Sequence, residues 1–588
     1  MCGIHFTIGP SPVEPSEEVL QLLSERGPDH IHTCQRTIER TQSGGAVSTV
    51  YATFTASVLS LMGQELVKQP LQDDDGSLMC WNGEAWKLDE EPITQNDGAV
   101  VFDALSRSSR AECGRVGRNC EEDECRGRAA AGVISVLASI SGPYAFAFYD
   151  ANHRILYFGR DLLGRRSLMT HQEGGALICS SVSTNNNRTW QETPAGEVQV
   201  LDLNQPTSNL FKGDHQVTKS MAIPYSFPSV NAALPPPFQT SAEDTSGTLI
   251  SAATELEHHL LASLRLRTGS CTLGPLDPES LSAVRVAILF SGGLDCTLLA
   301  YLAHTLHPAD NPIDLLNVAF ANPRLARKLA SDERENLLYE ACPDRILGRR
   351  SLLELQRTCP GRRWNFVCID LPYAEVLAHK KEVIRLMAPH ATEMDLSIAL
   401  PFYFAARGQG HIIPHSTEDS HDEEPQPQAY TTPSRVLISG LGADELFGGY
   451  TRHATALARG GYPALVAELQ SDFDRLGARN LGRDDRVLSR WAKEVRYPFL
   501  DERLVAWALD LPVWFKCVAP NQAQTGSKGG EDGAQGLPVT KRVLRVLARV
   551  KGLVAVAAEP KRAIQFGSRS AKMDKGRSKG TDLVEIVT

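Results

Sequence analysis

The sequence predicts an α+β half built on antiparallel sheets, followed by an α/β half built on a parallel sheet. In the first 200 or so residues, short runs rich in Val, Tyr, Phe and Ile are separated by Gly, Asp and Asn, which is typical of antiparallel strands. Beyond residue 249, short continuous apolar runs alternate with helical patterns, as in a parallel sheet covered on both faces. Prolines, serines and threonines between residues 204 and 248 predict a mostly extended linker.

Length and composition exclude several classes of protein. A chain of 588 residues is too long for one ordinary core, and 60 Lys and Arg against 70 Asp and Glu give a net charge of −10. That balance argues against a protein whose main partner is nucleic acid or an anionic membrane. No apolar run reaches the roughly 18–20 residues of a membrane helix. The opening residues carry no signal-peptide pattern, and the 13 irregularly spaced cysteines indicate a reduced, cytoplasmic protein.

The first half, expected over residues 2–203, contains the following elements. Strands are predicted at 46–55, 77–81, 143–149, 155–158, 176–180 and 197–201, and helices near 16–24 and 98–106. Residues 107–132 look like an insertion that cannot fold alone, because charged residues dominate it.

The second half is expected over residues 249–572. Helices are predicted at 249–266 and 297–304, and strands at 284–290, 314–320, 365–369 and 436–439. Residues 415–433, with acidic residues and three prolines, look like a second insertion, and residues 573–588 form a polar tail that should be frayed.

Cys2 is the first candidate for chemistry. Its small side chain permits removal of Met1, which would leave a free α-amine beside the thiol. An α-amine titrates near 8 and can take the thiol proton, so one residue would supply both nucleophile and base. The alternative is an inert cysteine that happens to lie second.

Further motifs follow Cys2 in a fixed order. They are Cys2-Gly3-Ile4, Arg26-Gly27-Pro28-Asp29, Gln69-Pro70-Leu71, Trp81-Asn82-Gly83-Glu84, Asn96-Asp97-Gly98, Gly142-Pro143-Tyr144-Ala145-Phe146-Ala147 and Gly159-Arg160-Asp161. In this order the motifs resemble the class II glutamine amidotransferases, which have the N-terminal-nucleophile fold of two antiparallel sheets with helices.

The resemblance implies roles for three residues. Asn82 and Gly83 match the oxyanion hole, and a side-chain amide with an unhindered N–H can both donate to a tetrahedral oxyanion. Asp97 matches the carboxylate that holds the α-ammonium of glutamine. Asn-Gly is also a strong hairpin signal, so a simple turn is the alternative. Val58 stands where the family has an arginine that pairs with the glutamine carboxylate, which puts glutamine affinity in doubt.

Ser291-Gly292-Gly293-Leu294-Asp295-Cys296 is the second candidate site. It follows a buried strand and opens a helix, so two glycines and a helix N-terminus can present consecutive N–H groups to a phosphate. Asp295 could hold Mg²⁺, which prefers carboxylate and phosphate oxygens. The alternative is a tight turn with a helix-start acid. The motif resembles the pyrophosphate loop of N-type ATP pyrophosphatases, with Cys296 in place of the usual serine.

Later motifs narrow the family. Residues 439–450 (SGLGADELFGGY) resemble the asparagine synthetase segment SGEGSDExFGGY, and residues 496–501 resemble its R-x-P-F-L-D. The resemblance implies an ATP and pyrophosphate site with Mg²⁺ at Asp295 and Asp444. The implied ATP-site residues are Leu289, Ser291, Gly292, Gly293, Asp295, Cys296, Val318, Ser439, Gly440, Asp444 and Lys541.

Two departures fall on chemical positions. Leu441 replaces a glutamate assigned to handling the ammonia nucleophile, and leucine cannot transfer protons. Pro538 replaces a lysine thought to neutralise the leaving pyrophosphate. Lys541 remains, and Arg545, Lys551 or Lys561 could substitute, although Lys541 could equally lie on a solvated helix face.

The resemblance implies a glutamine-hydrolysing, ATP-dependent amide synthetase. Its substrates would be glutamine and an acceptor carboxylate, of which aspartate is the first expectation. Its cofactors would be ATP and Mg²⁺, and a homodimer is possible. Residues 342–345, 480–486 and 560–569 resemble one particular member of the family, although Arg483 and Asp485 could equally serve an internal ion-pair network. The alternative function is a weak or inactive relative that acts as a binding or regulatory scaffold. A third hypothesis is an amidating enzyme with another acceptor.

Overall fold

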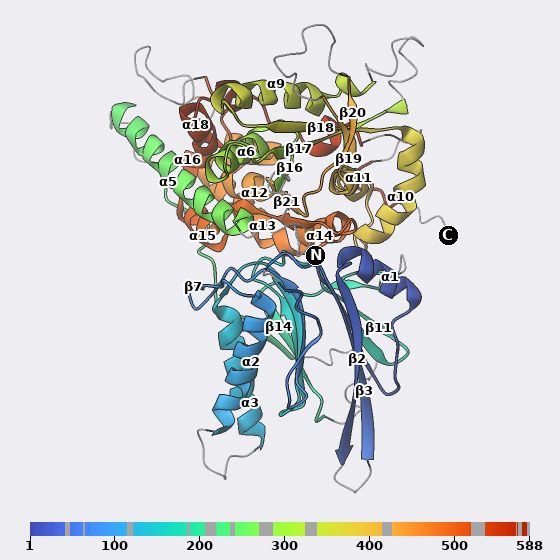
Figure 1. Cartoon of the computed structure of the whole chain (residues 1–588). Helices are drawn as coiled ribbons and strands as arrows, with labels where there is room; N and C mark the ends of the chain where they lie inside the picture. Colours follow the sequence, from blue (N-terminus) through green and yellow to red (C-terminus); the bar gives the residue numbers. More distant parts are fainter. Residues whose placement is uncertain are drawn as a thin grey trace.

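Antiparallel sheets fill the first part of the chain and a mostly parallel sheet the rest. The computed structural model describes all residues except 42–46, 63–64, 115–121, 185–188, 206–218, 236–241, 270–285, 324–337, 414–425, 519–535, 572, 574–578 and 585–588. The antiparallel part lies below the parallel part in Figure 1, and the N-terminus lies where the two meet.

Within the described residues, the first part holds two six-stranded antiparallel sheets and a small three-stranded sheet. The first sheet has the order β13 (Gln191–Glu192), β11 (Met169–Glu173), β12 (Ala176–Ser180), β1 (Gly3–Gly9), β3 (Val47–Val58) and β2 (His30–Thr41). The second has the order β15 (Lys219–Ala222), β14 (Glu197–Asp202), β10 (Ile155–Arg160), β9 (Tyr144–Asp150), β5 (Leu78–Gly83) and β4 (Leu71–Gln72). The small sheet contains β7 (Glu91–Pro92), β6 (Lys87–Leu88) and β8 (Ile140–Ser141).

The two large antiparallel sheets pack face to face. Alternate residues of β1, Ile4, Phe6 and Ile8, point into the shared core together with side chains of β5, β9 and β10. Helix α1 (Glu17–Arg26) covers the outside of the first sheet. Helices α2 (Asp97–Gly114) and α3 (Glu122–Ala138) cover the outside of the second, as Figure 1 shows at lower left. The result is a four-layered arrangement of helix, sheet, sheet and helix.

The second part is built on a seven-stranded sheet in the described residues. Its order is β20 (Gln428–Thr431), β19 (Gln409–Ile412), β18 (Trp364–Leu371), β17 (Ile313–Phe320), β16 (Val286–Leu289), β21 (Val436–Ile438) and β22 (Glu494–Arg496). The parallel strands are β18, β17, β16, β21 and β22, and β19 and β20 add an antiparallel edge.

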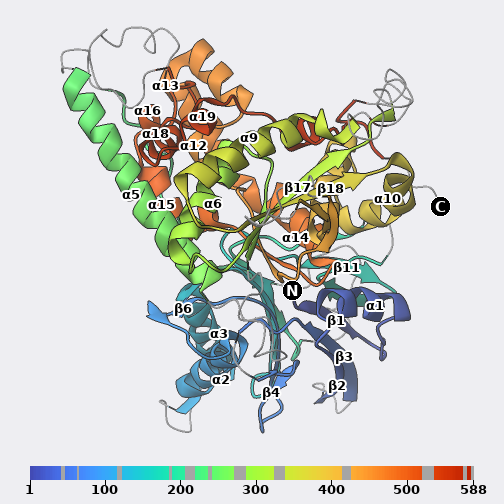
Figure 2. The same cartoon turned by 45° about the horizontal axis from the view of Figure 1, so that its top comes forward.

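Helices cover both faces of this sheet, and α5 lies along one flank in Figures 1 and 2. They are α5 (Ala242–Thr268), α6 (Leu294–Leu306), α9 (Pro343–Thr358), α10 (Tyr373–Met387), α11 (Glu393–Arg407), α12 (Ala443–Phe447), α13 (Thr451–Asp474), α14 (Gly482–Ser489), α15 (Glu502–Asp510), α16 (Val513–Lys516), α18 (Arg542–Val550), α19 (Val554–Ala558) and α20 (Ile564–Gly567), with short turns η1 (Gly477–Leu481) and η2 (Pro498–Leu500). In the part of the chain that the structure describes, none of the helices has both the length and the apolarity needed to cross a membrane.

Most predicted elements are confirmed, with ends shifted by a few residues. The predicted strand at 284–290 corresponds to β16, and its parallel pairing with β17 and β21 confirms the α/β interpretation. The sequence analysis missed several elements, among them β1, β2 and most helices beyond residue 340. It missed α3 because charged residues near its start suggested an insertion. The interpretation of 415–433 as an insertion was wrong for its described end, because β20 pairs with β19 at the edge of the sheet. Ala129 and Ala130 of α3 are buried against the second sheet, so the described ends of 107–132 belong to the fold.

The described parts of 204–248 and of the C-terminal tail are more ordered than predicted. β15 pairs with β14, and the amide of Asn231 donates to the carbonyl of Leu509 at 2.9 Å, so the extended segment is pinned at both ends. The prediction of a frayed tail was wrong for residues 579–584. The carbonyls of Asp582 and Gly580 accept from Glu393 and Met394, because the first N–H groups of helix α11 lack partners within the helix.

Buried charges join the two parts of the chain. The Arg26 guanidinium pairs with Asp485 at 2.9 Å, and Arg165 pairs with Glu502 at 2.5 Å. Arg165 also donates to the carbonyl of Leu500, 335 residues away in the sequence, at 2.8 Å. Because these arginines are about 1% exposed, the contact surface behaves as polar interior.

Candidate active site

The predicted phosphate loop leaves β16 and enters α6 without a side-chain cap. Gly293 is the N-cap residue, so the first N–H groups of this 13-residue helix stay available to a ligand. Gly292 adopts a φ of +78°, and a Cβ there would lie 2.4 Å from the amide nitrogen of Gly348 in α9. Glycine is therefore required at this position, both for the backbone turn and for the close approach of α9.

A cavity of about 400 Å³ opens at the carboxyl ends of the parallel strands. β17 and β21 pair with β16 on its two opposite sides, so the order of the strands reverses here. Ligands bind at such a position in open α/β sheets. Ten of the eleven residues predicted for ATP line the cavity. The eleventh, Gly292, packs against α9 instead. The ten are Leu289, Ser291, Gly293, Asp295, Cys296, Val318, Ser439, Gly440, Asp444 and Lys541.

Two carboxylates and two lysines form a cluster in the cavity wall. The Lys541 ammonium lies 2.6 Å from Asp295 and 2.6 Å from Asp444, and Lys561 pairs with the other oxygen of Asp444. Burial opposes ionisation of Asp444, but the two ammonium groups outweigh it and hold the pKa of this carboxyl well below its usual range. Lys541 is 2% exposed, which contradicts the alternative of a solvated helix face.

The backbone of Lys541 is strained into this position. Its φ is +54°, uncommon for a residue other than glycine, and it caps the start of α18. A Cβ on neighbouring Gly449 would lie 1.8 Å from the Asp444 carboxylate and 2.3 Å from the Lys541 side chain. The packing thus fixes the lysine between two acids, and such strain is often found at functional positions.

Of the cations considered as substitutes at Pro538, only Lys561 joins this cluster. Arg545 lines the cavity, but its guanidinium donates to backbone carbonyls of Thr540, Ala557 and Glu559. Lys551 pairs with Glu257 on helix α5. Leu441 lies in the cavity wall as a partly buried apolar side chain.

The loop cysteine keeps part of the role of a hydroxyl. The Cys296 thiol donates to the carbonyl of Gly293 at 3.3 Å and lies 3.7 Å from the hydroxyl of Ser291. Burial raises the pKa of this thiol, so it stays protonated. The substitution therefore preserves a weak donor inside the loop.

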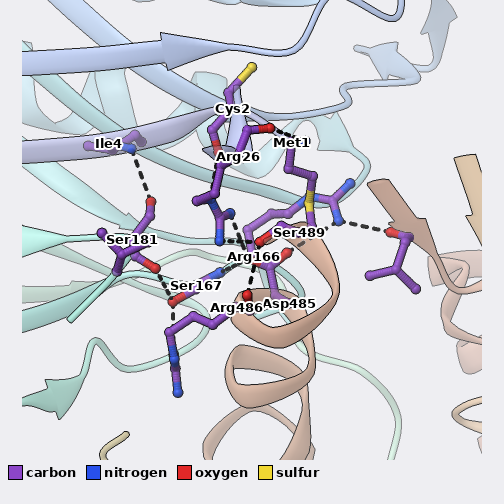
Figure 3. Close-up of polar contacts among 12 residues, drawn as sticks. Met1, Cys2, Ile4, Arg26, Arg166, Ser167, Ser181, Asp485, Arg486 and Ser489 are labelled. Atoms are coloured by element: carbon purple, nitrogen blue, oxygen red, sulfur yellow. Dashed lines mark hydrogen bonds and ion pairs between the residues drawn. The ribbon is translucent and has the colours of Figure 1, made fainter. Parts of the chain in front are cut away.

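The structure also brings Cys2, Asn82 and Gly83 together. Arg26 donates from Nε to the carbonyl of Cys2 at 3.1 Å. With its side-chain amide oriented to satisfy these neighbours, Asn82 donates to the same carbonyl at 3.0 Å and accepts from Arg26 at 3.3 Å. In Figure 3 the Cys2 sulfur points away from these polar contacts, while the Arg26 guanidinium also donates to Asp485. A Cβ on Gly83 would lie 2.7 Å from the carbonyl of Pro143, so only glycine fits there.

Met1 fills the space between Cys2 and the second part of the chain. Its amine donates to the carbonyl of Arg26 at 3.1 Å and reaches that of Lys493 at 3.4 Å. Burial lowers the pKa of this amine to about 5, and burial raises the pKa of the Cys2 thiol to about 11. With Met1 in place, the amine next to the thiol is therefore a neutral base, and the thiol is protonated.

Asp97 lies at the start of α2 and already has protein partners. One carboxylate oxygen accepts from the Trp81 indole at 2.8 Å and from the amide of Ala85 at 2.9 Å. Burial nonetheless raises its pKa to about 6. The structure therefore gives Asp97 a role in fixing β5, and its predicted role towards glutamine stays a prediction.

Helix α14 is a shared wall between the two candidate sites. Arg483 and Asp484 line the cavity, whereas Asp485 pairs with Arg26 beneath Cys2. Arg483 pairs with Asp484 and Asp395, so the alternative of an internal ion-pair network is confirmed for Arg483 and Asp485. The sequence analysis assigned no role to Asp344, which also lines the cavity.

Comparisons with known proteins agree with this geometry. The asparagine synthase family profile matches residues 459–578, which include Lys541 and Lys561. Asparagine synthetase domain-containing protein 1 of Bos taurus is 30% identical over 99% of this chain and 97% of its own length. A relative from Saccharomyces cerevisiae, also called an asparagine synthetase domain-containing protein, is 33% identical over 97% of this chain and 91% of its own length.

Among solved structures, a glutamine phosphoribosylpyrophosphate amidotransferase from B. subtilis is 15% identical, with a TM-score of 0.24 over 57% of this chain and 70% of that chain. At this TM-score the two structures are not closely alike. The two sequence relatives, by contrast, match nearly the whole chain at 30% identity or more. The chain belongs to the family of asparagine synthetase domain-containing proteins.

Proposed function

We propose that the protein is an ATP-dependent, glutamine-hydrolysing amide synthetase of the asparagine synthetase kind. The observation that carries the proposal is the cavity at the carboxyl ends of β16 and β21. A phosphate loop, two carboxylates and two lysines meet there, and about 400 Å³ is within the range of small-molecule sites.

The residues present fit a magnesium ion. Asp295 keeps one buried carboxylate oxygen without a hydrogen-bond partner among the described residues, and Asp444 faces it across Lys541. Two carboxylates with phosphate oxygens and water are the usual surroundings of Mg²⁺ in nucleotide sites. Asp295 and Asp444 would hold the ion, which when bound offsets the negative charge of the phosphates.

The two lysines then have a second use. In the structure their charges are offset by Asp295 and Asp444. If Asp295 and Asp444 held a divalent ion, Lys541 and Lys561 would be able to donate to phosphate oxygens beside the loop. Lys561 would thus supply the cation that Pro538 removes.

In the proposed reaction, Cys2 attacks the side-chain amide of glutamine and releases ammonia, and water then hydrolyses the γ-glutamyl thioester to glutamate and restores the thiol. Asn82 and the N–H of Gly83 stabilise the oxyanion, and the α-amine exposed by loss of Met1 takes the thiol proton. At the other site the acceptor carboxylate, proposed to be that of aspartate, displaces pyrophosphate from ATP. Ammonia then displaces AMP, giving asparagine, glutamate, AMP and pyrophosphate.

Two positions favour the alternative of a weak or inactive relative that serves as a scaffold. Val58 is buried at the end of β3, where a glutamine carboxylate would need a cation. Leu441 lines the cavity where the family places a proton-transferring glutamate. Neither side chain can do the expected chemistry.

The test is one assay of the full chain with glutamine, aspartate and MgATP, in which glutamate, AMP and asparagine are measured separately. We expect glutamate formation that Cys2→Ala abolishes, and asparagine formation that is slow because of Leu441. Leu441→Glu should raise asparagine formation by about 10²–10⁴-fold, the usual contribution of one proton-transfer group. Leu441→Gln is the matched control and should leave it unchanged. Absence of all three products from the wild type would favour the scaffold.

A further inference from the structure

A carboxylate that the proposed reaction does not use lies in the wall of the nucleotide cavity. Asp344 is the second residue of α9, lines the cavity and is 5% exposed. Its backbone carbonyl accepts from the Asn317 amide at 3.0 Å. Within the residues that the structure describes, no hydrogen bond or ion pair reaches its carboxylate oxygens.

This arrangement costs stability that the protein alone does not recover. Burial raises the pKa of Asp344 to about 7, and the nearest cations, Arg562 and Lys561, only partly oppose the shift. An acid in the first turn of a helix gains a little from the helix dipole, but a solvated aspartate there would gain this too. A carboxylate that is this little exposed and has no protein partner is rare, and because it lines a cavity it is placed to accept from a ligand there.

Its place in the fold indicates which part of a ligand reaches it. Asp344 lies one helical turn before Gly348, the residue against which the phosphate loop packs. Four residues at 1.5 Å rise correspond to about 6 Å. The backbone of Asp344 is therefore one helical turn away from the residue that the loop packs against, on the same cavity wall.

A C-terminal strap, residues 560–569, closes this end of the cavity. A Cβ on Gly567 would lie 1.9 Å from the Asp344 carboxylate, so the strap passes directly over it. The Cys342 thiol donates to the carbonyl of Gly567 at 2.9 Å, and the amide of Phe320 donates to that of Ser568 at 3.1 Å. The strap is thus fixed to the end of β17 and to the residue before α9, and it passes over the carboxylate without donating to it.

We propose that the Asp344 carboxylate accepts hydrogen bonds from the ribose 2′- and 3′-hydroxyl groups of the bound nucleotide. The inference rests on the proposed nucleotide site at Ser291–Asp295. Two carboxylate oxygens match a vicinal diol, and acidic residues bind ribose hydroxyls in other nucleotide folds. An ammonium ligand fits less well because Lys561 and Arg562 would repel it, whereas a neutral diol is not repelled.

The test is calorimetric titration of the full chain with MgATP, Mg-2′-deoxy-ATP and magnesium tripolyphosphate. We expect wild type to bind ATP at least about 10-fold more tightly than the 2′-deoxy nucleotide. Asp344→Ala should abolish that ratio by weakening ATP alone, and leave tripolyphosphate binding unchanged. Asp344→Asn should fall between the two and, without nucleotide, melt at a higher temperature than wild type, because an uncompensated charge is removed.

Glu559→Ala is the matched control, since this carboxylate lines the same cavity but pairs with Arg350 at 2.8 Å. It should keep the wild-type ratio. Equal wild-type affinity for both nucleotides would overturn the inference while leaving the nucleotide site intact. Equal weakening of all three ligands by both Asp344 variants would overturn it too, as a structural effect. Failure of wild type to bind any of the three would overturn the nucleotide site itself.

Discussion

Asp485→Ala is expected to lower the free energy of unfolding by about 3–5 kcal/mol, because it leaves buried arginines without their carboxylate partner. Asp485 pairs with Arg26 at 2.9 Å, lies 3.6 Å from Arg166 and accepts from the amide of Ser167 at 3.1 Å. Its side chain and those of the two arginines are at most 1% exposed. Urea denaturation of the full chain, followed by both circular dichroism and fluorescence, measures the change.

The control for this variant is an ion pair of the same kind on the surface. Asp103 pairs with Arg107 along helix α2, and both side chains are more than 60% exposed. Asp103→Ala should change stability by less than about 0.5 kcal/mol. A loss below about 1 kcal/mol for Asp485→Ala would contradict the view that this contact holds the two parts together. Because Arg26 also anchors the carbonyl of Cys2, glutamate formation should fall with it.

Lys561→Ala is expected to change two affinities in opposite directions. MgATP should bind about 10–100-fold more weakly, since a charge-assisted contact to phosphate is worth roughly 1.5–3 kcal/mol. Mg²⁺ alone should bind several-fold more tightly, because Asp444 loses one of its two cations. Calorimetry with each ligand measures both effects. A merely destabilised protein would lose affinity for both ligands. That result would contradict the proposal that Lys561 pairs with Asp444 in the free protein and with phosphate in the complex.

Lys551→Ala is the control for Lys561→Ala. Lys551 pairs with Glu257 at 2.6 Å and does not line the cavity. Its removal deletes the same charge without touching the cluster, so both affinities should stay at wild-type values.

The phosphate loop could be predicted from the sequence because its chemistry is local. Ser291, two glycines and Asp295 follow one another between a buried strand and a helix, and each needs only its neighbours to define its role. The same holds for Cys2, whose proposed role as nucleophile depends on being second in the chain. The parallel strands were found because burial on both faces leaves a continuous apolar run.

The features that sequence analysis missed depend on distant contacts. β1 does show the alternation of a strand, with Ile4, Phe6 and Ile8 separated by His5 and Thr7, but its polar residues are buried as well, and that burial depends on the neighbouring strands and loops. Asp344 was indistinguishable from an ordinary helix-start acid until the strap was placed over it. The partners of Arg26, Arg165 and Asp485 could not be predicted, because nothing in their sequence neighbourhood shows that two parts of the chain meet there.

The most direct test of the account is whether the cavity at the ends of β16 and β21 binds MgATP. Calorimetric titration of the full chain should show one MgATP per chain, and Asp295→Ala should remove most of the affinity. At about 100 times the dissociation constant, MgATP should also stabilise wild type by roughly 2.7 kcal/mol. Absence of heat and of a melting shift with millimolar MgATP, or an Asp295→Ala variant that binds like wild type, would contradict the assignment of this cavity as the nucleotide site.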